Sequence, residues 1–130
     1  TNLKIPLFES GVSAGFPSPA DDYLDLPIDL NEFLIKHPAA TFYVRVKGNS
    51  MEGAGIKNGD LLIVDRAEEP RRNSIVLGVI DGDFTVKRIR KKGGELYLIP
   101  DNPDFKSIKI DDNMDFQVWG VVTYVVHKPK

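Results

Sequence analysis

The sequence contains no cysteine among its 130 residues, and its two histidines, His37 and His127, lie far apart along the chain. A chain without cysteine has no disulfide framework, no thiolate metal ligand and no thiol nucleophile. Two isolated histidines do not supply the clustered ligands of a zinc centre. We therefore expect no metal, no cofactor and no redox chemistry.

Long apolar runs and a dominant charge are missing as well. The longest apolar stretch, 118–126, is interrupted by Gly120 and Thr123 and is much shorter than the roughly 20 residues of a membrane helix. The chain does not open on a basic segment followed by an apolar run, so we expect a cytoplasmic protein without a membrane partner. Seventeen basic and nineteen acidic residues give a net charge of -2. This excludes a global basic field, and any contact with DNA is then local or made through partners.

What the sequence does contain is typical of one compact domain rich in turns, with 42% hydrophobic residues, 11 glycines and 9 prolines. From residue 41 onward, β-branched and aromatic runs alternate with Gly, Asn, Asp and Pro turns. These runs predict strands at 41–47, 61–66, 74–81, 83–90, 95–100, 107–110 and 116–126. The fold class is therefore predicted to be mostly β.

Two local signals refine this prediction. Asp81-Gly82 lies between two of the predicted strands and favours a two-residue hairpin, because type I′ turns need positive φ at both central positions. Asp29 is followed by Glu32 three residues later, which predicts the start of a short helix that ends before His37-Pro38. We expect this to be the one sizeable helix.

The first 27 residues differ from the rest in composition. The alternation of Leu3, Ile5 and Leu7 predicts one short strand, after which glycines and prolines interrupt any regular element. We predict an extended N-terminal arm over 1–27 and a β-rich domain over 28–130.

A serine stands where a predicted strand gives way to a tight turn, in Gly48-Asn49-Ser50-Met51. Such a turn presents the hydroxyl of Ser50 with little backbone around it. A serine in this setting is most often a simple turn or cap residue. As a nucleophile it would need a base beside it, because an unassisted hydroxyl is a poor attacker near neutral pH.

The candidate bases are few. Neither histidine accompanies an acid in a recognisable triad order. Within 83–90, strand alternation places Lys87 on one face with Thr85 and Ile89, and such a face can bury an amine. A lysine base requires a pKa lowered from about 10.4 to about 7, which desolvation can supply. The alternative is a solvated basic run that contacts phosphates or protects a sheet edge from aggregation; its members are Lys87, Arg88, Arg90, Lys91 and Lys92.

Several segments occur in an order that is more specific than any one of them. They are Ala14-Gly15-Phe16-Pro17-Ser18-Pro19-Ala20, Ile28-Asp29-Leu30-Asn31, Gly48-Asn49-Ser50-Met51, Asn58-Gly59-Asp60-Leu61-Leu62-Ile63-Val64-Asp65 and Phe84-Thr85-Val86-Lys87. Through nearly its whole length the chain resembles the UmuD branch of the LexA-type self-cleaving serine peptidases. The resemblance implies a LexA/UmuD-like peptidase β-fold and a Ser-Lys dyad with Ser50 as nucleophile and Lys87 as general base. It aligns the self-cleavage site with Ala14-Gly15.

The residues at that bond suit this chemistry. The small Ala14 and the following Gly15 allow the backbone to approach Ser50 closely, and the flanking prolines keep the arm extended. The backbone N–H groups of Ser50 and Met51 are the expected oxyanion donors. Two positions depart from the branch: Ala14 stands where its best-known member has cysteine, and Asn49 where aspartate is usual.

The resemblance also implies partners and a role. In this family a RecA filament on single-stranded DNA stimulates self-cleavage after DNA damage, and the shortened homodimer joins a UmuC-like polymerase that copies past lesions. Removing residues 1–14 takes away Lys4 and Glu9 together, so the net charge does not change. The lost segment is mainly apolar, and we hypothesise that it covers a hydrophobic surface used by partners.

Two other interpretations remain open. A LexA-like transcriptional repressor has the same dyad in a C-terminal self-cleavage domain, preceded by a helix-turn-helix domain of about 70 residues in that family. Only 14 residues precede Gly15 in this sequence, and its Phe16-Pro17-Ser18-Pro19 arm resembles UmuD more closely. The second alternative is a catalytically silent β-domain that binds partners, with Ser50 and Lys87 as structural residues.

Overall fold

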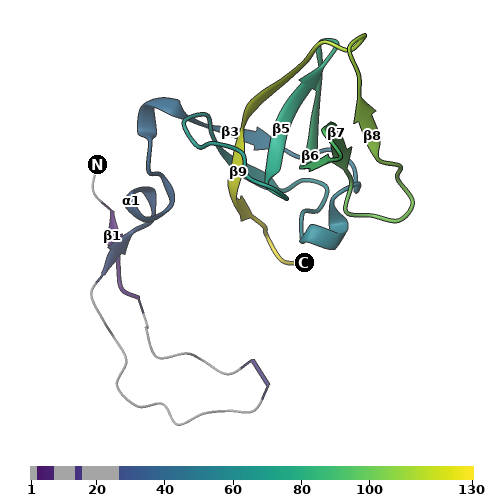
Figure 1. The fold of residues 1–130 in the computed structure, drawn as a ribbon. Helices are drawn as coiled ribbons and strands as arrows, with labels where there is room; N and C mark the ends of the chain where they lie inside the picture. Colours follow the sequence, from purple (N-terminus) through teal and green to yellow (C-terminus); the bar gives the residue numbers. More distant parts are fainter. Residues whose placement is uncertain (1–2, 8–13, 16–26) are drawn as a thin grey trace. The chain divides into compact units, whose positions relative to one another are not determined.

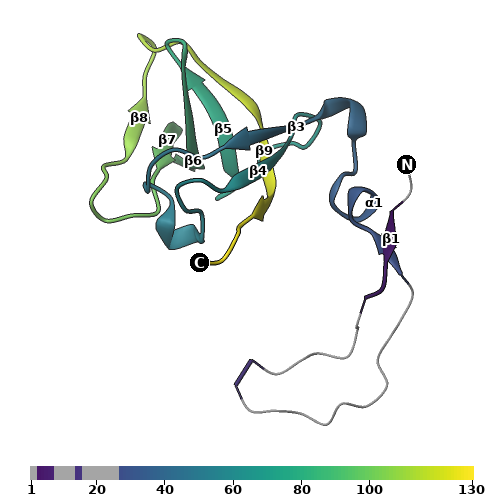
Figure 2. The ribbon, with the colours of Figure 1, turned by 180° about the vertical axis from the view of Figure 1, so that it is seen from behind.

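A computed structural model describes residues 3–7, 14–15 and 27–130. The chain divides into two compact units, residues 1–36 and 37–130, which Figures 1 and 2 draw from opposite sides. The Phe16-Pro17-Ser18-Pro19 segment of the arm lies outside the described residues. Within the described ranges, no helix is long and apolar enough to cross a membrane.

The N-terminal unit contains a short strand pair and a helix. Strand β1 (Lys4–Ile5) pairs antiparallel with β2 (Ile28–Asp29), so that Ile5 lies opposite Ile28. Helix α1 (Leu30–Leu34) follows β2 directly, and the side chain of its N-cap, Asp29, accepts a hydrogen bond from the backbone N–H of Asn31 at 2.9 Å. The predicted cap and short helix are confirmed, and α1 is the one α-helix of the described ranges.

The second unit opens with a 3-10 turn, η1 (Pro38–Ala40), and then forms a seven-stranded antiparallel sheet. Its strands are β3 (Thr41–Arg45), β4 (Leu61–Asp65), β5 (Ile75–Ile80), β6 (Asp83–Lys92), β7 (Glu95–Ile99), β8 (Ile108–Ile110) and β9 (Phe116–Val126). All seven predicted strands are present, and the mostly β fold class is confirmed. The strand order is β3-β4-β9-β5-β6-β7-β8. Figure 1 shows β9, the last strand in the chain, running beside β5.

The predicted hairpin between β5 and β6 is also confirmed. Ile80 pairs with Asp83 across the turn, and Asp81 and Gly82 have φ values of 49° and 89°. Positive φ at both central positions is the requirement of a type I′ turn. This hairpin fixes the register of β6 and therefore the position of Lys87 opposite Val76.

The core lies between the strands and the turn that follows β3. Its buried cluster is Met51, Ile56, Leu62, Val64 and Leu77. Close packing extends to the backbone of β9, where a Cβ added to Gly120 would stand 2.6 Å from Cγ1 of Val64. Met51, the residue that follows Ser50, belongs to this core and therefore anchors the turn that carries Ser50.

Candidate active site

The turn after β3 presents Ser50. The chain leaves the strand at Arg45, bends at Gly48 with φ 90°, and enters a second 3-10 turn, η2 (Glu52–Ala54). Met51 is only 3% exposed, whereas Ser50 is half-buried. The hydroxyl therefore stands at the surface of a packed turn, as its sequence context predicts.

Lys87 reaches this hydroxyl from β6. Its Nζ lies within hydrogen-bond distance of three oxygen atoms: Ser50 Oγ at 2.9 Å, Thr85 Oγ1 at 2.9 Å and the carbonyl oxygen of Val86 at 3.1 Å. The amine is half-buried, and burial lowers the pKa of Lys87 below its ordinary value, because a desolvated ammonium is disfavoured. The structure thus brings together the serine and the lysine that the sequence singles out.

Both groups line a hollow of about 220 Å³. Its walls come mainly from the end of β3, the residues after it and the first half of β6, and they include the apolar side chains of Val44, Phe84 and Val86. Two unpaired strand edges border this hollow. In the described sheet β3 is an edge strand, and β6 pairs only with β5 until Arg88, where its pairing with β7 begins. An extended peptide can enter beside such unpaired strand edges.

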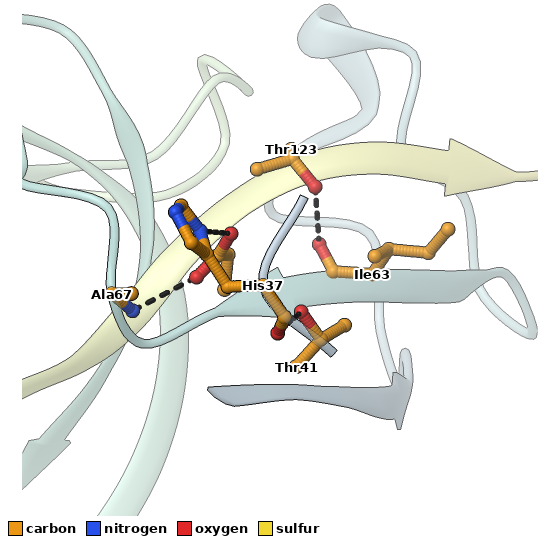
Figure 3. A network of polar contacts seen from close by, with 6 residues as sticks. His37, Thr41, Ile63, Ala67 and Thr123 are labelled. Atoms are coloured by element: carbon orange, nitrogen blue, oxygen red, sulfur yellow. Dashed lines mark hydrogen bonds and ion pairs between the residues drawn. The ribbon is translucent and has the colours of Figure 1, made fainter. Parts of the chain in front are cut away.

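The two histidines are engaged elsewhere. His37 Nδ1 lies 2.6 Å from Asp65 Oδ2, and His127 Nδ1 lies 2.7 Å from Asp60 Oδ1. Asp60 directly precedes β4, Asp65 is its last residue, and both are nearly fully buried. The other carboxylate oxygen of Asp65 accepts from the backbone N–H of Ala67 at 2.8 Å. Figure 3 labels His37 and Ala67, whose contacts are drawn as dashed lines. Neither histidine contacts Ser50, so a histidine-based triad has no support in the geometry.

These contacts also set the protonation of the two acids. Burial alone would raise the pKa of Asp65, but hydrogen bonds from His37 and from the backbone N–H of Ala67 hold it below its ordinary value. Burial likewise opposes ionisation of Asp60, and bonds from the backbone N–H of Lys57 and from His127 lower its pKa. Both carboxylates are therefore charged parts of the fold at neutral pH.

One group among the described residues has the spacing of metal ligands. His37, Asp65 and Glu68 offer one ligand atom each, and these atoms lie within 4.8 Å of one another. His37 and Asp65 already bond each other, and this group is separate from the hollow beside Ser50. We assign it no part in the chemistry of that hollow.

The basic run is largely committed to contacts within the fold. Besides Lys87, Arg88 bonds the Asp101 carboxylate and the carbonyl oxygen of Asn73, and Arg90 donates twice to Asn73 Oδ1. Arg88 and Arg90 therefore hydrogen-bond the loops that contain Asn73 and Asp101. Lys91 and Lys92 remain exposed.

The remaining predicted site residues are placed as follows. Ala14 and Gly15 are exposed and belong to the N-terminal unit. Among the described residues, the backbone N–H groups of Ser50 and Met51 donate to no protein acceptor. Sequence reasoning missed the loop after β7, where Asp101 and Asn102 bond the Ser50 turn. The turn chemistry of Pro100-Asp101-Asn102 marks a loop, but no local signal links it to residue 50.

Comparison with known proteins identifies the family. Residues 6–123 match the Peptidase S24-like family. ImpA of Escherichia coli is 46% identical over 126 residues, which cover 96% of this chain and 85% of that protein. MucA of Escherichia coli is 44% identical over 122 residues, covering 93% and 83%. A LexA repressor of Shewanella baltica is 40% identical over 111 residues, which cover 85% of this chain and 53% of the repressor.

These matches agree with the fold and with the family resemblance of the sequence. They support a serine peptidase fold and a place in the DNA-damage response. The chain belongs to the Peptidase S24-like family and, within it, to the UmuD-like proteins of SOS mutagenesis.

Proposed function

We propose that this protein cleaves its own chain between Ala14 and Gly15, with Ser50 as nucleophile and Lys87 as general base. The observation that carries the proposal is the 2.9 Å contact between Lys87 Nζ and Ser50 Oγ in a half-buried hollow. A serine and a base within hydrogen-bond reach are the minimum that nucleophilic catalysis requires.

The contacts of Lys87 suit the neutral amine that a base must be. A neutral amine has two N–H donors and one lone pair, and the structure places three oxygen atoms around Nζ. If Thr85 Oγ1 and the Val86 carbonyl accept the two hydrogens, the lone pair faces the hydroxyl of Ser50. Thr85 is then a positioning residue, because it holds the amine in the orientation that accepts a proton.

The reaction follows from these roles. Ser50 Oγ forms a bond to the carbonyl carbon of Ala14 while its proton passes to Lys87 Nζ. The ammonium then protonates the nitrogen of Gly15, the C–N bond breaks, and the N-terminal fragment remains as an ester on Ser50. Water, deprotonated by Lys87, hydrolyses this ester and restores the free hydroxyl.

The negative oxygen that develops on Ala14 needs donors. We assign this part to the backbone N–H groups of Ser50 and Met51, which have no protein acceptor among the described residues. Fixed backbone donors stabilise an oxyanion without reorganising during the reaction.

The role of the cleavage follows from the family. We propose that a RecA filament on single-stranded DNA stimulates it, and that the shortened chain, as a homodimer, serves a UmuC-like polymerase in translesion synthesis. The relationship to SOS mutagenesis proteins supports this proposal. Contact with DNA is then made through these partners.

The test is incubation of the purified protein at mildly alkaline pH, without any partner, followed by mass spectrometry. We expect a new N-terminus at Gly15 that accumulates with time. The variants Ser50→Ala and Lys87→Ala should remain intact by mass while circular dichroism shows an unchanged β signal. A wild-type chain that stays whole would support the silent β-domain interpretation, and cleavage in either folded variant would refute the dyad.

A further inference from the structure

The loop between β7 and β8 bonds the turn that carries Ser50 at three places. The backbone N–H of Asp101 donates to the carbonyl oxygen of Ser50 at 2.8 Å, and the N–H of Gly53 donates to the carbonyl oxygen of Asp101 at 2.6 Å. The side-chain amide of Asn102 donates to the carbonyl oxygen of Asn49 at 2.8 Å. The backbone on both sides of Ser50 is therefore held by one loop.

This loop is itself well braced. Asn102 Oδ1 accepts from the backbone N–H of Asp104 at 2.9 Å, and the Asn102 carbonyl accepts from Phe105 at 3.1 Å. The amide group of Asn102 is thus fixed at both of its ends. The contact with the turn is also tight, since a Cβ added to Gly53 would stand 2.5 Å from the Asp101 carbonyl oxygen.

Asp101 also connects this loop to the strand of the lysine. Its carboxylate accepts from Arg88 Nε at 3.1 Å, and Arg88 follows Lys87 in β6. A partly exposed ion pair of this kind contributes modest stability. Its consequence is geometric, because one residue is joined both to the turn of the nucleophile and to the strand of the base.

These bonds also orient the backbone N–H groups of Ser50 and Met51, because of the geometry of the peptide unit. In a trans peptide unit the C=O and the N–H point in opposite directions. The carbonyl of Asn49 shares its peptide unit with the N–H of Ser50, and the carbonyl of Ser50 shares its unit with the N–H of Met51. The loop bonds both carbonyls, and the Asn49 carbonyl also accepts from the backbone N–H of Glu52 at 3.2 Å. The two N–H groups therefore point to the other side of the turn, away from the loop.

We infer that Asn102 is a positioning residue that, together with the Asp101 backbone, aims the two oxyanion donors of the Ser50 turn. Asn102 acts through Asn49 and Ser50. This inference rests on the proposed self-cleavage, and it adds a determinant of its rate that is remote in sequence from both members of the dyad.

The test compares Asn102→Ala and Asn102→Asp with Asn113→Ala, an exposed loop asparagine used as the matched control. Asn102→Asp keeps an acceptor for the Asp104 N–H but loses the donor to the Asn49 carbonyl. This variant therefore removes the bond to the Ser50 turn while it keeps the bond within the loop. Removing a direct oxyanion donor costs about 100-fold to 1000-fold. We expect both Asn102 variants to lower the alkaline cleavage rate by about 10-fold to 100-fold, while Asn113→Ala cleaves like the wild type.

Two further readouts distinguish positioning from general damage. The shape of the pH profile should be unchanged in Asn102→Ala, because the contacts of Lys87 are untouched. In ¹⁵N-labelled protein the amide resonances of Ser50 and Met51 should shift in both Asn102 variants and stay in place in Asn113→Ala. Wild-type rates or unmoved resonances in the Asn102 variants would overturn the inference. A wild-type chain that never shortens refutes the proposed function instead, and the resonances still report whether Asn102 orients the turn.

Discussion

The two units of the chain differ in how much apolar surface they bury. In the N-terminal unit a two-residue strand pair and a five-residue helix leave Leu3, Ile5, Leu30 and Phe33 each more than half exposed. The second unit covers its core with a seven-stranded sheet, and Leu62 and Val64 are fully buried there. Burial of apolar area is the main source of folding free energy. We conclude that the second unit has its own core, to which the N-terminal unit need not contribute.

This contrast fits the proposal that the chain is both peptidase and substrate. The proposed cut between Ala14 and Gly15 separates β1 from β2 and leaves every strand of the seven-stranded sheet in place. The peptidase fold can therefore survive its own reaction. The following predictions test this separation between the two units, beginning with the largest effect.

The rate of self-cleavage should depend strongly on pH through a group of the second unit alone. Burial lowers the pKa of Lys87, and the base must be neutral, so the rate should rise with pH and level off above that pKa. On the acid side each unit of pH should cost about 10-fold in rate, or about 100-fold over two units. Quantitative mass spectrometry of the Gly15 product measures this. A rate that falls as pH rises, or one that persists in Lys87→Arg, would contradict it.

A matched pair of leucine substitutions compares the two units directly. Leu62→Ala removes a fully buried side chain and should lower the free energy of unfolding by about 2 to 5 kcal/mol. Leu30→Ala changes a side chain that is 56% exposed, and the unfolding of the second unit should change by less than about 0.5 kcal/mol. Trp119, the one tryptophan, lies edge-on to Phe84 and reports this transition in denaturant. Equal losses from the two variants would show that the units are not separable.

The hydrogen bond between exposed His37 and buried Asp65 should make the second unit sensitive to acid. The pKa of Asp65 is lowered in the fold, so its stabilising contribution is present above about pH 3.9, the unfolded value, and is lost as pH falls through the folded pKa. His37→Ala should cost about 1 to 3 kcal/mol near neutral pH, and less in strong acid. Lys36→Ala, an exposed neighbour, serves as control. Unfolding curves at several pH values check this, and an equal loss at all of them would speak against the pair.

The smallest effect concerns the surface that β1 covers. In the N-terminal unit a hollow of about 400 Å³ is lined by Leu3, Ile5 and Leu7 on the arm side and by Ile28 and Leu30 on the other. Cleavage would release the first group, so binding of an apolar fluorescent dye should increase modestly after complete cleavage. Ser50→Ala, treated in the same way, should show no increase. Unchanged dye binding after full cleavage would refute the hypothesis that the arm covers a partner surface.

Local sequence signals predicted most of the fold. The turn at Asp81-Gly82, the Asp29 cap and all seven strands could be read from short segments, because each depends on the conformational preferences of a few adjacent residues. Ser50 and Lys87 were singled out by turn context and strand alternation, and the family resemblance joined them. Their contact spans 37 positions, and no local pattern encodes such a distance.

The remaining features depend on packing between distant segments. The bonds from Asp101 and Asn102 to the Ser50 turn, and the burial of Asp60 and Asp65 beneath the two histidines, follow from which strands become neighbours. Periodicity gives the faces of a strand but not its place in the sheet. The strand order was therefore beyond the reach of the sequence.

The place of β9 has a consequence for the timing of the reaction in a growing chain. This strand joins β4 to β5 in the middle of the sheet, although it follows all six other strands in sequence. Within the sheet, β9 is therefore the strand that pairs the β3–β4 half with the β5–β6 hairpin, and during synthesis it is made after both. Ser50 stands after β3 and Lys87 lies in β6, so the sheet that carries the two proposed catalytic residues is complete only when β9 is in place. The proposed self-cleavage is then expected only after the last strand of the sheet has been made.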